Sequence, residues 1–177
     1  LGWAGLARAH HIQAGYGWAP VGEGYEAARE AAERALALTP NLAEGHVALG
    51  HVLAFHDWNW KAAEEEFRRA CALAPGSAEV LRGLAMLCGL LGRHEEAVEH
   101  ARRAVELDPL SAMTHRAYGQ RCAAADRLDE AVAAFNAALD LDPRSGLANG
   151  HLALARLRQG RPDEALSQFE AAVCIAH

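Results

Sequence analysis

The sequence AVELDP at residues 104–109 is followed 34 residues later by ALDLDP at residues 138–143. Two earlier segments also end in proline, at Pro40 and Pro75. Together with Pro109 and Pro143, these make four prolines that are 35, 34 and 34 residues apart. Proline and the residue before it are both disfavoured inside a helix, so each proline marks the end of a helical segment. This spacing predicts a helical unit that repeats along the whole chain.

Each interval between these prolines contains the pattern of two helices. In the third interval, apolar or small side chains recur every three or four residues on both sides of a turn at Gly92, which is the spacing of one helix face. The members of this pattern are Leu81, Leu84, Ala85 and Cys88 before the turn and Ala97, Ala101 and Ala104 after it. The fourth and fifth intervals repeat the pattern, with turns at Asp126 and Gly160.

Composition agrees with helices and excludes several other classes of protein. The chain has 41 alanines but only 12 Val, Ile and Thr residues among its 177, which argues against a β-sheet protein. A net charge of −6 argues against general binding of nucleic acid or anionic membranes, and no uncharged apolar run is long enough to span a bilayer. The four cysteines, Cys71, Cys88, Cys122 and Cys174, lack metal-binding spacing and are expected to be free thiols, as in a cytoplasmic protein.

Small residues recur at fixed places within the unit. The eighth position is Gly50, Ala85, Gly119 or Ala153, the twentieth is Ala63, Ala97, Ala131 or Ala165, and the twenty-fourth carries Phe67, Phe135 or Phe169. With the 34-residue period, this pattern resembles the tetratricopeptide repeat, a helix–turn–helix unit. The resemblance implies an all-α, right-handed α-solenoid of five antiparallel helix pairs. The expected repeats are residues 1–40, 41–75, 76–109, 110–143 and 144–177 of a single array, which we expect to be a segment of a longer chain.

The first two repeats depart from the pattern at the turns between their helices. We expect a long loop at about residues 13–22 in the first repeat, with Tyr16 and Trp18, and an extra residue in the second repeat, beside Trp58 and Trp60. These features resemble a bacterial subset of the family that is attached to winged-helix transcriptional regulators, adenylate cyclases or protein kinases. Two interpretations of the four aromatic side chains stay open. They form either a buried plug under the long loop or an exposed aromatic ledge for a partner, and the exposure of Trp18 and Trp58 decides between them.

The resemblance also implies a concave groove lined by the first helix of each repeat. Its expected side chains are Glu44, Val47, His51, Phe55, Glu79, Arg82, Met86, Leu90, Met113, Arg116, Gln120, Leu147, Leu154 and Arg158. The Lys and Asn residues that clamp a C-terminal carboxylate in some family members are absent here. The mixture of apolar residues and arginines suits a peptide with apolar anchors and some acidic residues. The alternative that the arginines serve only to keep this face soluble stays open.

The expected function is therefore that of a protein-interaction scaffold, and the alternative is a regulatory region of a larger bacterial signalling or transcription-regulator protein. No nucleotide-binding, hydrolase or metalloprotease motif is present. His46, His51 and His56 are five residues apart and do not share a helix face. We accordingly expect no enzyme activity, no cofactor and no metal. In the last helix, Phe169, Val173 and Ile175 form an apolar stripe that predicts further repeats or self-association.

Overall fold

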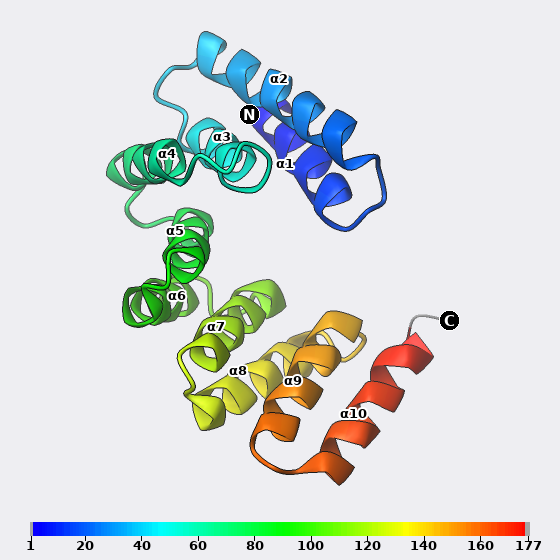
Figure 1. Cartoon of the computed structure of the whole chain (residues 1–177). Helices are drawn as coiled ribbons and strands as arrows, with labels where there is room; N and C mark the ends of the chain where they lie inside the picture. Colours follow the sequence, from blue (N-terminus) through cyan, green and yellow to red (C-terminus); the bar gives the residue numbers. More distant parts are fainter. Residues whose placement is uncertain (1, 176–177) are drawn as a thin grey trace. The chain divides into compact units, whose positions relative to one another are not determined.

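The computed structural model describes residues 2–175, with side chains as far as Val173. Over this range the chain forms ten α-helices and no strand (Figure 1). The helices are α1 (Gly2–Gly15), α2 (Val21–Leu38), α3 (Ala43–Phe55), α4 (Trp60–Leu73), α5 (Ala78–Leu90), α6 (His94–Leu107), α7 (Ala112–Ala124), α8 (Leu128–Leu141), α9 (Gly146–Arg158) and α10 (Pro162–Ile175). The all-α prediction is confirmed. None of the described helices has the length and apolar character needed to cross a membrane.

The chain folds into two compact units, the first ending at Leu87 and the second starting at Cys88. In the first unit, α1 pairs with α2 and α3 pairs with α4, and α3 packs on both helices of the first pair. In the second unit, α7 pairs with α8 and α9 with α10, while α6 contacts α7 and α8 contacts α9. Each unit is thus a stack of helix hairpins, as a helical-repeat protein requires.

The prolines that revealed the repeat also follow the second helix of each of the first four pairs. The residues that directly precede them (Thr39, Ala74, Asp108 and Asp142) leave the helical conformation, with φ between −136° and −143°. The proline ring excludes the helical conformation at the preceding residue, which explains why these helices all stop at the same place in the repeat. Side chains then cap the following helices: the Ser111 hydroxyl accepts from the Thr114 amide and the Ser145 hydroxyl from the Ala148 amide.

Alanines are the most frequent residues of the core, and its two largest fully buried side chains are phenylalanines. Phe67 and Phe135 are almost completely buried, and each ring lies directly on the backbone of a glycine. A Cβ atom added to Gly119 would lie 2.6 Å from the Phe135 ring, and one added to Gly83 would lie 2.5 Å from the Phe67 ring. The glycines are therefore sites of close helix approach, and Gly119 is one of the small residues at the eighth position of the repeat.

The first repeat differs from its prediction at both ends of the long loop. α1 continues to Gly15 and α2 already begins at Val21, so the connection is shorter than the expected residues 13–22. Gly24 lies inside α2, where a Cβ would be only 2.8 Å from the Ala14 Cβ. Gly24 is therefore needed for the close contact between α1 and α2, because a larger residue would not fit at this position.

Candidate functional site

A cationic surface lies on α7 and α9 in the second unit. Arg116 and Gln120 are one helical turn apart on α7, so they share a face, and His151 lies opposite them on α9. The His151 Nδ1–H donates to the Leu147 carbonyl oxygen over 2.5 Å, which leaves Nε2 to accept a hydrogen bond from the Gln120 amide over 2.8 Å. Burial, together with the charges of Arg116 and Arg121, lowers the pKa of His151 below its ordinary value. The imidazole is therefore held neutral by its burial and by the two cations.

Arg121 is the unusual member of this surface. Its guanidinium packs over Gly89, a position where any Cβ would collide with it, and burial lowers its pKa. Among the described residues, neither Arg121 nor Arg116 forms an ion pair with a carboxylate, whereas Arg127 pairs with Glu95 and Arg158 with Asp126. A partly buried cation that lacks a counter-charge favours binding of an anion. We name Arg116, Gln120, Arg121 and His151 the cationic surface.

The groove residues that were predicted from the sequence differ in their exposure and in their contacts. In the first unit, Val47 is only 3% exposed, so its predicted role as an accessible groove contact is wrong. His51 is partly buried, and its ring centroid lies 4.5 Å from that of His11 and 5.2 Å, edge on, from that of Phe67. Glu79 forms an ion pair with Arg8. The other groove residues of this unit are exposed (Glu44) or partly buried (Phe55, Arg82 and Met86).

In the second unit the apolar groove residues are accessible. Leu90, Met113, Leu147 and Leu154 are all exposed, and Arg116 and Gln120 are partly buried. Arg158 does not extend freely, because it donates to the Ala123 carbonyl oxygen over 2.6 Å and binds Asp126 at 2.8 Å. Arg121 and His151 were not among the groove residues predicted from the sequence. The only signal for Arg121 was the small residue Gly89 one repeat earlier, whose proximity the sequence does not reveal.

The aromatic residues of the first two repeats are exposed. Trp18 is 75% exposed and Trp58 is 69% exposed, so the interpretation of a buried plug is wrong for both. Tyr16 stacks on Trp18 at 5.3 Å, and Trp58 meets Trp60 edge on at 6.4 Å. Among the described residues no ring contact joins the first of these pairs to the second. We call the four residues the aromatic ledge.

Trp58 has a backbone conformation that tryptophan rarely adopts. Its φ is +55°, and the residues at the same place in the next three repeats, Gly92, Asp126 and Gly160, have φ values of +74°, +61° and +75°. Glycine and aspartate tolerate this left-handed conformation, whereas a bulky side chain is strained in it. A strained tryptophan that is mostly exposed contributes little to the fold, which points to a role outside it.

Comparison with known sequences explains this architecture. The sequence profile of the tetratricopeptide repeat matches residues 58–112 and 119–176, well over half of the chain. The chain belongs to the tetratricopeptide repeat family. No curated protein sequence matches this tetratricopeptide repeat protein.

Solved structures of tetratricopeptide repeat proteins share its fold. TTC0263, a thermophilic protein from Thermus thermophilus, is 24% identical, with a TM-score of 0.79 over 96% of this chain and 91% of that one. A MamA fragment from Desulfovibrio magneticus RS-1 is 18% identical, with a TM-score of 0.71 over 98% and 95%. YrrB, described as a tetratricopeptide repeat protein with an unusual peptide-binding site, is 23% identical, with a TM-score of 0.65 over 86% and 78%. At these identities the likeness extends to the fold alone.

Proposed function

We propose that this protein is an interaction scaffold that binds an acidic protein segment on the cationic surface of α7 and α9. The observation that carries the proposal is Arg121, whose partly buried guanidinium has no carboxylate partner among the described residues. A carboxylate of the partner would supply the missing counter-charge, and Arg116 lies near enough to act on the same imidazole. The negative net charge of the chain makes such a cationic area distinctive.

Apolar anchors complete the proposed site. Met113, Leu147 and Leu154 are exposed on the two helices that carry the cationic surface. Burial of exposed leucine and methionine side chains provides affinity, while charged hydrogen bonds to the arginines fix the register of the bound chain. The preferred ligand is therefore a segment in which acidic and large apolar residues are mixed. A ligand of either character alone would use only half of the site.

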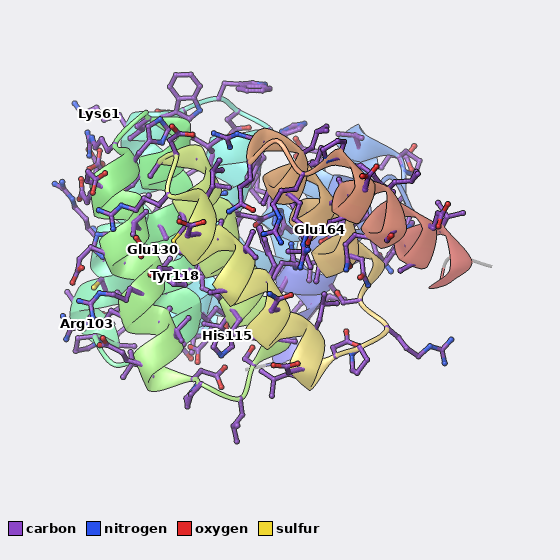
Figure 2. The ribbon with its side chains drawn as sticks, turned by 90° about the horizontal axis from the view of Figure 1, so that it is seen from below. Lys61, Arg103, His115, Tyr118, Glu130 and Glu164 are labelled. Atoms are coloured by element: carbon purple, nitrogen blue, oxygen red, sulfur yellow. The ribbon has the colours of Figure 1, made fainter. Side chains whose placement is uncertain are left out.

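The test is to select peptides from a random displayed library and to measure their affinities by fluorescence anisotropy. Selected peptides should be rich in Asp, Glu and apolar residues, and their binding should weaken as salt concentration rises. Arg121→Gln should lower the affinity by about tenfold or more, because a buried charge pair loses one partner. Arg103→Gln changes an exposed arginine on α6 and is the matched control (Figure 2). Peptides without acidic enrichment, or equal affinities for the two variants, would contradict the proposal.

A second function is favoured by the aromatic ledge. The array would act as a regulatory region whose ledge docks a further domain of a larger signalling protein, as in the family members attached to winged-helix regulators, cyclases or kinases. The strained and exposed Trp58 supports this alternative. The gene sequence on either side of the chain tests it: an adjoining domain of one of these classes is expected, and a gene that encodes none would contradict it.

Trp58→Gly should raise the stability of the protein by about 1 kcal/mol, because glycine adopts the left-handed conformation without strain. Chemical denaturation of the purified variant measures this change. Trp18→Gly is the control: Trp18 is similarly exposed, but the left-handed residue of its turn is Gly17, so no gain is expected. A loss of stability in Trp58→Gly would mean that the indole ring holds the turn in place and that Trp58 is a structural residue of the turn, which would contradict a role in docking.

A further inference from the structure

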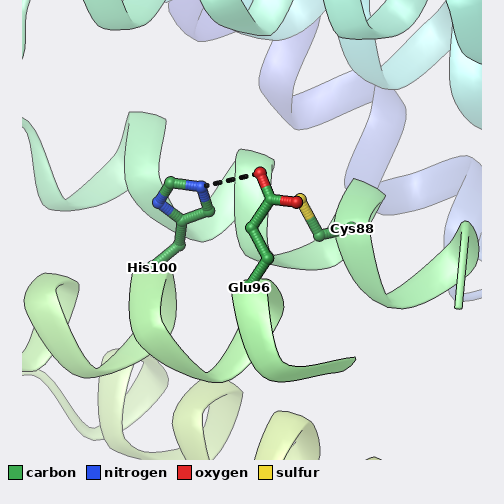
Figure 3. A group of neighbouring side chains, drawn as sticks. All are labelled: Cys88, Glu96 and His100. Carbon is green, nitrogen blue, oxygen red and sulfur yellow. Dashed lines mark ion pairs between the residues drawn. The ribbon is translucent and has the colours of Figure 1, made fainter. Parts of the chain in front are cut away.

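Three side chains capable of binding a metal converge between α5 and α6 (Figure 3). Cys88 lies near the end of α5, and Glu96 and His100 lie one turn apart in the first half of α6. The ligand atoms of the three residues all lie within 4.8 Å of one another. The His100 Nε2 and the Glu96 Oε1 are 3.7 Å apart.

The burial of the three residues is graded. Cys88 is only 3% exposed and forms the floor of the group, His100 is partly buried and Glu96 is exposed. A thiol with little freedom to move is a pre-organised ligand, and the exposed carboxylate leaves a route by which an ion can enter. In Figure 3 the Glu96 carboxylate lies between the thiol and the imidazole.

The next repeat has two of the three side chains at the equivalent positions and lacks the histidine. Thirty-four residues further on, Cys122 and Glu130 correspond to Cys88 and Glu96, but Ala134 stands where His100 would be. There the Glu130 carboxylate accepts a hydrogen bond of 2.9 Å from the Tyr118 hydroxyl, which lies beside it in Figure 2. Burial raises the pKa of the Cys122 thiol to about 11, so this thiol stays protonated.

The third repeat differs from the fourth at two of these positions, those of Tyr118 and Ala134. Leu84 replaces the tyrosine, so no hydroxyl from this position occupies the Glu96 carboxylate, and His100 adds a third donor. In the fifth repeat the same cross-hairpin pair is Arg156 and Glu164, which form an ion pair. Among these three repeats, only the third combines a thiol, a carboxylate and an imidazole at these positions.

We propose that Cys88, Glu96 and His100 bind a Zn²⁺ ion. Thiolate, imidazole and carboxylate are the ligands that zinc takes in proteins, and a thiolate disfavours Mg²⁺ and Ca²⁺. Zinc bonds of about 2.0–2.2 Å in tetrahedral geometry place nitrogen and oxygen ligands roughly 3.4 Å apart, so the 3.7 Å between His100 and Glu96 requires only a small adjustment. The Cys88 S–H loses its proton to solvent on binding, and a water molecule fills the fourth position.

The test uses the metal alone, added to the purified reduced protein. Zn²⁺ should bind with a stoichiometry of one in calorimetry and should raise the thermal midpoint, because it binds the folded state only. Co²⁺ in place of zinc should give a thiolate-to-cobalt charge-transfer band. Cys88→Ala should abolish this band, and Glu96→Gln and His100→Gln should each lower zinc affinity by about tenfold or more. These last two variants change more exposed positions, so the test survives if Cys88→Ala folds poorly.

Two matched variants separate this site from general metal binding. Cys122→Ala removes the equivalent buried thiol of the next repeat, and His94→Gln removes an exposed histidine from the same helix as His100. Both should bind zinc as the unmodified chain does. The proposal is overturned if Cys122→Ala weakens binding as much as Cys88→Ala, if His94→Gln matches His100→Gln, or if Co²⁺ gives no thiolate band.

Discussion

Phe135→Ala should lower the free energy of unfolding by about 3–5 kcal/mol, the range found when a fully buried aromatic side chain is removed from a core. Phe135 is 1% exposed, and its ring contacts the Gly119 backbone so closely that no Cβ fits between them. The ring also belongs to the cluster that holds α6, α7, α8 and α9 together, with Val98, Cys122 and Leu152. Alanine at this position leaves a cavity that rigid helix backbones on several sides cannot close.

The same position of the last repeat provides the matched control for this measurement. Phe169 lies 34 residues after Phe135 but is 38% exposed, and among the described helices α10 packs on α9 alone. Phe169→Ala should therefore cost much less, about 1 kcal/mol or below, in the same urea titration. Similar losses in the two variants would show that the Phe135 ring is not the wedge between repeats that its burial indicates.

The fold was largely predictable because the information that specifies it is local. The distance between Pro109 and Pro143 gives the repeat, and each proline forces the residue before it out of the helix whatever the tertiary structure. The glycine at position 119 and the phenylalanine at position 135 belong to one repeat, so their contact follows from the hairpin itself. The loop of the first repeat is shorter than expected because α1 and α2 pack on each other, a contact that the local sequence pattern does not reveal.

The candidate sites were less predictable because they depend on contacts between elements. Val47 has the sequence position of a groove residue, but α1 packs on α3 and Val47 is buried. Arg121 is a candidate binding residue because its guanidinium packs over Gly89, on a different helix, and because it has no acidic partner among the described residues. The spacing of Cys88, Glu96 and His100 spans a turn, so no contiguous metal motif marks it. The self-association predicted from the last helix stays a prediction: Phe169 and Val173 are exposed, and the Ile175 side chain lies outside the described residues.

Acidification should destabilise the protein well before its carboxylates are protonated, because two histidines in the first unit are held neutral. Burial lowers the pKa of His11 from 6.5 to about 3, with a further contribution from His51. Burial also lowers the pKa of His51 to about 4, and Arg82 adds to the shift. The unfolded chain takes up these protons below about pH 6.5, whereas the folded chain does so only near pH 4 and below. The stabilising contribution of the neutral rings is therefore complete above about pH 6.5 and is lost as the pH falls toward 4.

The expected slope is about 1.4 kcal/mol of unfolding free energy per pH unit for each histidine in this window. Urea titrations at a series of pH values between about 7 and 4.5 measure it. His11→Phe should reduce the slope by roughly half, because one of the two titrating rings is gone. Phenylalanine also suits the site: His11 packs against Tyr25, Phe55 and His51, and among the described residues its buried Nδ1 has no hydrogen-bond partner.

His94→Gln, which changes an exposed histidine of α6, is the control and should leave the slope unaltered. The loss of an unsatisfied nitrogen means that His11→Phe should be at least as stable as the unmodified chain at about pH 8. If His11→Phe keeps the full acid slope, the destabilisation arises elsewhere, and the stacked pair of His11 and His51 is not the acid-sensitive part of the fold. If the slope falls, burial of these imidazoles in the interior sets the acid limit of the first unit, since His51 then titrates alone against Arg82.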